Sequence, residues 1–155
     1  MKVRFGDIVE IKTSKGLAYA IYTHRHTQPP KYGALIRVFD QLYQSRPVRT
    51  DELISTPIRF SAFFPLQAAV TKGIVEVVGH VSIPKNLLPF PLFRSGIVDP
   101  QTKRVRIWWI WDGKKSWRVG DLTSEQRKLP IRGVWNDTYL VHRIEEGWRP
   151  EKDSR

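Results

Sequence analysis

Histidine side chains are the first residues whose spacing could support chemistry. His24 and His26 form an H-x-H pair, and side chains two residues apart on a strand share a face, where they could share a metal ion. The chain has no cysteine, and no carboxylate lies close to this pair, so we expect a polar strand end and no metal site. His80 and His142 stand beside expected core positions, where hydrogen bonds to backbone groups are the simpler role.

Carboxylates occur in adjacent pairs at Asp51-Glu52 and Glu145-Glu146. Neighbouring residues on a strand point to opposite sides, so neither pair suits general acid–base catalysis. The chain also lacks a dinucleotide-binding glycine loop, a Walker-type loop and a G-x-S-x-G element. We therefore expect no enzyme, no catalytic residues and no cofactor. The enzymatic alternative is a metal-independent ribonuclease that uses distant residues such as His24 and His142.

Aromatic and cationic residues gather in the stretch RVRIWWIWDGKKSWRV, from Arg104 to Val119. Residues 99–119 hold six lysines and arginines against two carboxylates, and residues 25–49 hold five against one. The whole chain carries a formal net charge of +11 and has a sequence pI of about 10.2. This balance favours phosphate, anionic lipid or an acidic protein surface as a partner.

The dipeptide Asp112-Gly113 between two strand-like segments predicts a two-residue type I′ hairpin turn, in which both positions need positive φ. Because side chains alternate between the faces of a strand, this turn predicts one core face and one half-exposed face. The predicted pairs are Trp111 with Lys114, Trp109 with Ser116, and Trp108 with Trp117. The core face holds Trp108, Ile110, Trp117 and Val119. The half-exposed face holds Ile107, Trp109, Trp111, Lys114, Ser116 and Arg118.

The half-exposed face supplies the predicted partner-binding residues. These are Trp109, Trp111, Lys114 and Arg118, with Arg104 and Lys103 at the rim. Trp and Arg dominate protein–protein hot spots, and indoles beside cations also suit single-stranded nucleic acid. A structural interpretation is equally open, in which the indoles pack under another strand while the cations extend to solvent. Of the two binding interpretations, the protein partner is favoured.

Residue periodicity predicts strands along almost the whole chain, and these would position the aromatic face. The expected strands include Gly6–Lys12, Leu17–His24, Ala34–Asp40, Ile58–Leu66, Ile74–Pro84 and DTYLVHRIEEGW near the C-terminus. Short helical turns are expected at Arg46–Thr56 and Leu122–Pro130, QAAVTKG fits helix or strand, and Trp135 is expected to plug a barrel end. The prediction is an all-β fold, a partly open barrel or sandwich of about eight short strands with one or two short helical insertions.

Domain organisation and location follow from composition. We expect a single domain over residues 1–148 and a flexible C-terminal tail over 149–155, because RPEKDSR is polar and contains proline. The N-terminal MKVRFGDIVEIK has no apolar signal-peptide region, and no apolar run approaches the ~20 residues of a membrane span. The absence of cysteine fits a cytoplasmic protein. The oligomeric state is left open.

With its strands in order, the sequence resembles the all-β immunity proteins of bacterial polymorphic toxin systems, immunity protein family twenty-six. It also resembles widespread uncharacterised bacterial proteins of similar length. The resemblance spans most of residues 6–119 and rests largely on β-elements. The segments that carry it are Gly6–His24, Tyr32–Asp40, Phe63–Val70 and Trp108–Gly113.

This resemblance implies a non-catalytic cytosolic protein that neutralises a cognate toxin, often a nuclease, by binding it. The family has no catalytic residues to carry over. Inhibitors of basic nucleases are usually acidic, whereas this chain carries +11, so either the toxin is acidic or not a nuclease, or the fold has changed its task. The leading hypothesis is therefore a protein-binding module that occludes an acidic toxin surface. The alternative is a single-stranded nucleic-acid-binding barrel that uses the same basic aromatic face.

Overall fold

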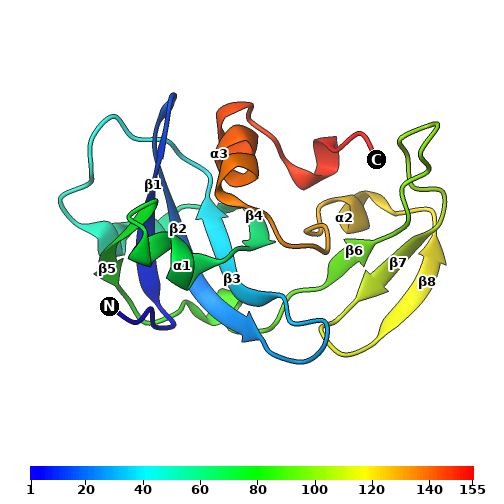
Figure 1. Ribbon diagram of the computed structural model, residues 1–155, viewed down its shortest axis with the longest axis horizontal. Coiled ribbons are helices and arrows are strands. Elements are labelled where there is room, and N and C mark those ends of the chain that lie inside the picture. Colours follow the sequence, from blue (N-terminus) through cyan, green and yellow to red (C-terminus); the bar gives the residue numbers. More distant parts are fainter. The chain divides into compact units, whose positions relative to one another are not determined.

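The computed structural model describes all residues, Met1–Arg155 (Figure 1). Eight strands form two antiparallel sheets, neither closed into a barrel, so the all-β prediction is confirmed. None of the helices combines the length and the apolar content needed to cross a membrane. In chain order the elements are β1 (Asp7–Thr13), β2 (Gly16–His26), β3 (Gly33–Phe39), η1 (Thr50–Ser55), β4 (Ile58–Phe63), α1 (Leu66–Thr71), β5 (Val75–His80), η2 (Lys85–Leu87), β6 (Phe93–Ser95), β7 (Trp108–Trp111), β8 (Ser116–Gly120), α2 (Ser124–Arg127), α3 (Asp137–Glu145) and η3 (Pro150–Lys152).

The chain divides into two compact units, each with one sheet. The first unit comprises Met1–Pro89 and Gly133–Gly147, and the second comprises Phe90–Arg132 and Trp148–Arg155. Compact units of this kind occur inside single domains as well as between domains. The division of the chain into one domain and a tail therefore stays a prediction.

The sheet of the first unit has the strand order β4-β3-β2-β1-β5 and is antiparallel throughout. β1 and β2, which correspond to the expected strands Gly6–Lys12 and Leu17–His24, form a hairpin in which Thr13 pairs with Gly16. Gly16 has a φ of +132°, and a Cβ there would meet the carbonyl oxygen of Tyr43 at 2.8 Å. The turn therefore requires glycine at this position. One buried cluster on this unit gathers Ile8, Tyr19, Ile21, Phe39, Leu53 and Leu87.

The C-terminal segment DTYLVHRIEEGW forms the helix α3, so the predicted strand is wrong. Asn136 caps the helix, because its side chain accepts a hydrogen bond from the backbone N–H of Tyr139 at 2.7 Å. Leu140 and Ile144 are four residues apart and both are buried, which is the spacing of one helix face. A capped end and this spacing outweigh the strand propensity of the individual residues. The ambiguous QAAVTKG segment also contributes a helix, α1.

The sheet of the second unit has the strand order β6-β7-β8. Arg94 on β6 is completely buried and donates to the carbonyl oxygens of Arg127 at 2.9 Å and Pro150 at 2.7 Å. Its guanidinium lies 4.9 Å from the ring centre of Trp108, within cation–π range. Burial lowers the pKa of Arg94 to about 10, so the side chain stays charged at neutral pH. One buried cation thus links the sheet to the end of α2 and the start of η3 in the same unit.

Residues 149–155, for which the sequence predicts a flexible tail, are bonded within the second unit. Trp148 Nε1 donates to Asp153 Oδ2 at 3.0 Å, and Arg155 Nε donates to Asp153 Oδ1 at 2.9 Å. The backbone N–H of Val105 donates to the carbonyl of Arg155 at 3.3 Å. Asp153 is buried, and its carboxylate holds the C-terminal residues in place through these hydrogen bonds.

Candidate partner-binding groove

The hairpin that carries the predicted site has a longer loop than the sequence suggests. Trp111 pairs with Ser116, Ile110 with Trp117 and Trp109 with Arg118, so the predicted two-residue turn is wrong. The Asp112 side chain accepts hydrogen bonds from the backbone N–H groups of Lys114 at 2.9 Å and Lys115 at 2.8 Å. These bonds close a four-residue loop over residues 112–115, in which Gly113 alone takes a positive φ, +98°. The Asp-Gly pair therefore forms a loop that is held by the aspartate side chain, because a carboxylate can accept hydrogen bonds from the backbone N–H groups that follow it.

The register differs from the predicted one by two residues, and a shift of two keeps each side chain on its predicted face. Trp109, Trp111, Ser116 and Arg118 therefore still share one face, and Ile110 shares the other with Trp117. A bulge interrupts the ladder, because Trp108 pairs with Gly120 while Trp109 pairs with Arg118. The sorting of side chains in the central part of the hairpin follows the prediction, although its pairing does not.

Trp109 and Trp111, which the sequence places together on the half-exposed face, differ in how deeply they are buried. Trp109 is 40% exposed, whereas Trp111 is only 3% exposed. Phe93, the cross-strand partner of Trp111 on β6, has its ring centre 5.4 Å from the indole, and Phe90 lies edge-on at 5.8 Å. The guanidinium of Arg132 lies 4.2 Å from the same ring. Trp111 is therefore a core residue, and it offers no surface to a partner.

Trp117 departs from the prediction in the opposite direction to Trp111. The sequence predicts that it is a core residue, whereas in the structure it is 40% exposed. Its neighbour Ile110 on β7 is 1% exposed on the same face. β8 is the outer strand of its sheet, so a side chain on it has a neighbouring strand on one side only. Position at the edge of the sheet explains the exposure of Trp117.

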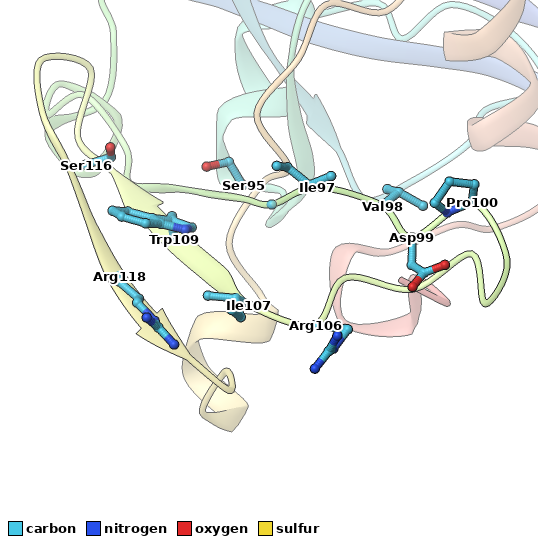
Figure 2. A pocket seen from close by; sticks show the side chains of 11 residues that line it. Ser95, Ile97, Val98, Asp99, Pro100, Arg106, Ile107, Trp109, Ser116 and Arg118 are labelled. Carbon is cyan, nitrogen blue, oxygen red and sulfur yellow. The ribbon is translucent and has the colours of Figure 1, made fainter.

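Trp109 lies in a groove of about 890 Å³ within the second unit. Figure 2 shows Trp109 and Ile107 flanked by Ser116 and Arg118 of β8 on one side and by the segment from Ser95 to Pro100 on the other. Exposed apolar side chains dominate the lining: Ile97 is 90% exposed, Ile107 42% and Val98 37%. The full lining is Ser95, Gly96, Ile97, Val98, Asp99, Pro100, Arg106, Ile107, Trp109, Ser116 and Arg118.

Two cations and one carboxylate border the groove, namely Arg106, Arg118 and Asp99. Asp99 Oδ1 is engaged in its own turn, where it accepts from the backbone N–H groups of Gln101 at 2.8 Å and Thr102 at 3.3 Å. Arg106 and Arg118 are exposed and form no ion pair in the structure. The border of the groove is therefore positive, and its floor is apolar.

The predicted site residues fall into three places. Trp109 and Arg118 line the groove. Lys103 and Arg104 are exposed in the turn that joins Val98 to its bridge partner Val105, beside the lining residues Asp99 and Arg106. Lys114 is exposed in the hairpin loop outside the lining, and Trp111 is buried.

Sequence reasoning missed the wall formed by Ile97, Val98 and Pro100. Their segment, GIVDP, reads as an ordinary strand end followed by a turn. The sequence feature that could have identified them is the order of residues along the chain. Two adjacent apolar residues are followed directly by Asp-Pro, which favours a turn, and then by a basic segment. Arg106, which is not among the predicted site residues, also borders the groove.

The histidines and acids considered for chemistry have structural partners in the first unit. His24 Nε2 lies 2.7 Å from the carbonyl oxygen of Leu88, and burial lowers the pKa of His24. His26 Nδ1 lies 3.1 Å from the carbonyl oxygen of Pro30. No group of three or more histidine and carboxylate side chains gathers in a way that could hold a metal ion.

A polar cluster that the sequence did not indicate joins the buried Glu10 and Tyr19 to the exposed Arg46 and Glu76. Its carboxylate accepts from Arg46 Nε at 2.8 Å, from Arg46 Nη2 at 3.1 Å and from Tyr19 Oη at 2.8 Å. Arg46 also reaches Glu76, which pairs with Glu10 across β1 and β5. The hydrogen bonds from Arg46 lower the pKa of Glu10. Every oxygen of this carboxylate is engaged, so the cluster fastens the loop that carries Arg46 to the sheet.

Comparisons of the chain with protein-family models, with curated proteins and with solved structures found no match. The resemblance to toxin-immunity proteins therefore stays a prediction from the sequence. The evidence for function is the geometry of the groove.

Proposed function

We propose that the protein is a non-catalytic binding module that captures an acidic protein partner, in the manner of a toxin-immunity protein. The observation that supports this proposal is the half-exposed indole of Trp109 on the floor of an apolar groove, with Arg106 and Arg118 at its border. The resemblance of the segments Gly6–His24 and Trp108–Gly113 to immunity proteins supplies the class of partner.

The energetics of such a groove suit an anchored protein partner. A partner side chain that covers Trp109, Ile97 and Ile107 removes apolar surface from water, which contributes roughly 25 cal/mol per Å². Interface hot spots are enriched in Trp and Arg and are surrounded by groups that exclude water. Arg106 and Arg118 would attract carboxylates on the partner and increase its rate of association. The apolar floor supplies affinity, and the cations select an acidic partner.

The lining also fits a protein partner better than single-stranded nucleic acid. Nucleic-acid grooves place successive aromatic side chains along a cationic track, so that each base has a stacking partner. This groove has one tryptophan and no other aromatic residue, and its remaining large apolar side chains are aliphatic. The net charge of +11 still favours phosphate. Nucleic acid is therefore the second candidate, and the test includes it.

The test co-expresses the protein in bacteria with the product of the gene immediately upstream of its own, and it follows growth and complex formation. We expect the protein to restore growth and to bind that polypeptide stoichiometrically. A labelled single-stranded oligonucleotide at low salt forms the second arm. Retardation with a slope of log affinity against log salt of about −0.7 per phosphate contact would favour nucleic acid. Unrestored growth, or the lack of a toxic neighbour, contradicts the proposal.

Groove variants connect the binding to the named residues. Trp109→Ala should weaken the complex by at least about thirtyfold, which is the scale of a hot-spot residue, and Arg118→Glu should slow association. Arg25→Glu is the matched charge control, because Arg25 is also exposed on a strand, in the first unit. Equal losses in Trp109→Ala and Arg25→Glu would place the partner outside the groove.

A further inference from the structure

The two edges of the β6-β7-β8 sheet differ. The outer side of β6 is covered, because Arg94 N donates to the carbonyl of Pro130 and Arg132 N donates to the carbonyl of Arg94, both at 2.9 Å. The outer side of β8 is open: Ser116–Gly120 forms no hydrogen bond beyond its pairing with β7. Unpaired backbone groups along a strand are a template for another strand.

The side chains of β8 offer different chemistry on its two faces. Arg118 and Ser116 point to the groove face, beside Trp109, and Trp117 points to the other. Trp117 is 40% exposed although its neighbour Ile110 is buried. A strand laid along the open edge would place one side chain beside Arg118 and the next in sequence beside Trp117. That added strand would cover the indole of Trp117, which the β6-β7-β8 sheet leaves half-exposed.

We infer that the partner binds by strand addition: an extended acidic segment pairs with the open edge of β8, with carboxylates beside Arg118 and apolar side chains beside Trp117. This inference rests on the proposed binding function and specifies its mode. Main-chain hydrogen bonds would give affinity, and alternate side chains would give specificity, as in other cases of β-augmentation.

Charge decides between an acidic partner and a second copy of this chain. Residues 114–120 contain Lys114, Lys115 and Arg118 and no carboxylate. Pairing of β8 with itself would place these cations against one another, and like charges on paired strands are destabilising. A segment that alternates carboxylates with apolar residues complements both faces at once. The open edge therefore selects a foreign acidic strand.

The test uses a capped synthetic peptide of alternating glutamate and valine, with calorimetry for affinity and NMR hydrogen exchange for the backbone. We expect binding, together with slowed exchange of the outward-facing amides of residues 116–118. Successive backbone N–H groups of an extended peptide point to opposite edges, so two peptides, each N-methylated at one alternate set of nitrogens, test the two edges separately. The methylated set that faces β8 should lose about tenfold or more in affinity, whereas the other set should bind as the parent does.

Charge reversal tests the register. Arg118→Glu should reject the glutamate peptide and accept its lysine counterpart, while Arg25→Glu should behave as the wild type. Trp117→Ala should weaken binding about tenfold. A scrambled peptide of the same composition that binds equally well overturns strand addition, and so does equal affinity of both methylated sets.

The outcomes separate this inference from the proposed function. If the upstream polypeptide binds in a Trp109-dependent way while no peptide slows exchange in β8, strand addition is wrong and the groove function stands. If neither binds, both are wrong. Self-association that slows exchange in β8 would replace the acidic partner with a second copy and overturn the inference.

Discussion

Trp109 and Trp111 show how little a residue type says about its role. They are two positions apart on β7 and share a face. Trp111 meets Phe90 edge-on and lies beneath the guanidinium of Arg132, whereas Trp109 lies opposite Ser95 and Arg118 and stays 40% exposed. The difference is set by the segment that covers each indole and not by the strand that carries it.

Alanine at these two positions should therefore separate stability from binding. Trp111→Ala opens a cavity in the core and should lower the free energy of unfolding by about 3–5 kcal/mol. Trp109→Ala removes a half-exposed ring and should stay within about 1 kcal/mol of wild type. Urea denaturation followed by circular dichroism measures both. Equal destabilisation by the two variants would mean that Trp109 is also core, and the groove assignment would be lost.

At the scale of elements, α3 is the clearest departure from the sequence-based expectation. Its residues include Tyr139, Val141 and Ile144, which favour strands individually. The helix forms because Asn136 supplies a cap and because Leu140 and Ile144 face the same buried side. Arg59 Nη2 donates to the carbonyl oxygens of Arg143 at 3.3 Å and Ile144 at 3.0 Å, which satisfies groups that a helix end leaves open.

Loss of the cap should weaken this helix measurably. Asn136→Ala removes the acceptor for the Tyr139 amide and should cost about 1 kcal/mol of stability. Asn136→Asp keeps an acceptor and should restore most of that loss. Thr138→Ala, at an exposed helical position, leaves the cap intact and is the control, in which stability should be unchanged or slightly higher. Thermal unfolding of the three variants provides the comparison. A wild-type melting temperature in Asn136→Ala would mean that tertiary packing alone holds α3.

At the scale of the whole molecule, the response to acid should depend on buried carboxylates. Burial raises the pKa of Asp153, but hydrogen bonds from Arg155 and Trp148 outweigh it and lower that pKa to about 2, against a usual value of 3.8. A carboxyl whose pKa is lower in the folded state stabilises the fold above its unfolded pKa. That contribution is lost as the pH falls from about 3.8 through about 2.

Asp153→Asn should therefore flatten the acid end of the stability profile. Each pKa unit corresponds to about 1.4 kcal/mol, and allowing for solvent screening, the stability lost by wild type over this interval should be on the order of 1–2 kcal/mol. Guanidinium denaturation at a series of pH values between 2 and 6 measures it, with Asp121→Asn, an exposed carboxylate, as the control. If the stability of Asp153→Asn varied with pH as that of wild type does, the side-chain carboxylate of Asp153 would not be coupled to folding.

Much of the architecture follows from local patterns in the sequence. Periodicity and strand-favouring residues predicted the strands β1, β2 and β3. In the structure each of these strands has at least five consecutive buried residues, so both of its faces are covered. The short helical turn expected at Leu122–Pro130 corresponds to α2, where Thr123 forms a capping box with Gln126. The strand prediction failed at α3, because a cap at Asn136 and the four-residue spacing of Leu140 and Ile144 outweigh the strand propensity of the individual residues.

The sequence by itself determined the class of fold, the basic charge and the grouping of Trp109 with Arg118 on one face, since all three depend on local spacing and composition. Only the tertiary structure decided that Trp111 is core, that Trp117 is open and that Ile97 and Val98 complete a groove. Exposure depends on which distant segment covers a face, and covering segments such as Phe90 and residues 95–100 have no fixed spacing from the strands that they cover. Sequence periodicity sorts side chains between faces, and tertiary packing decides which face meets water.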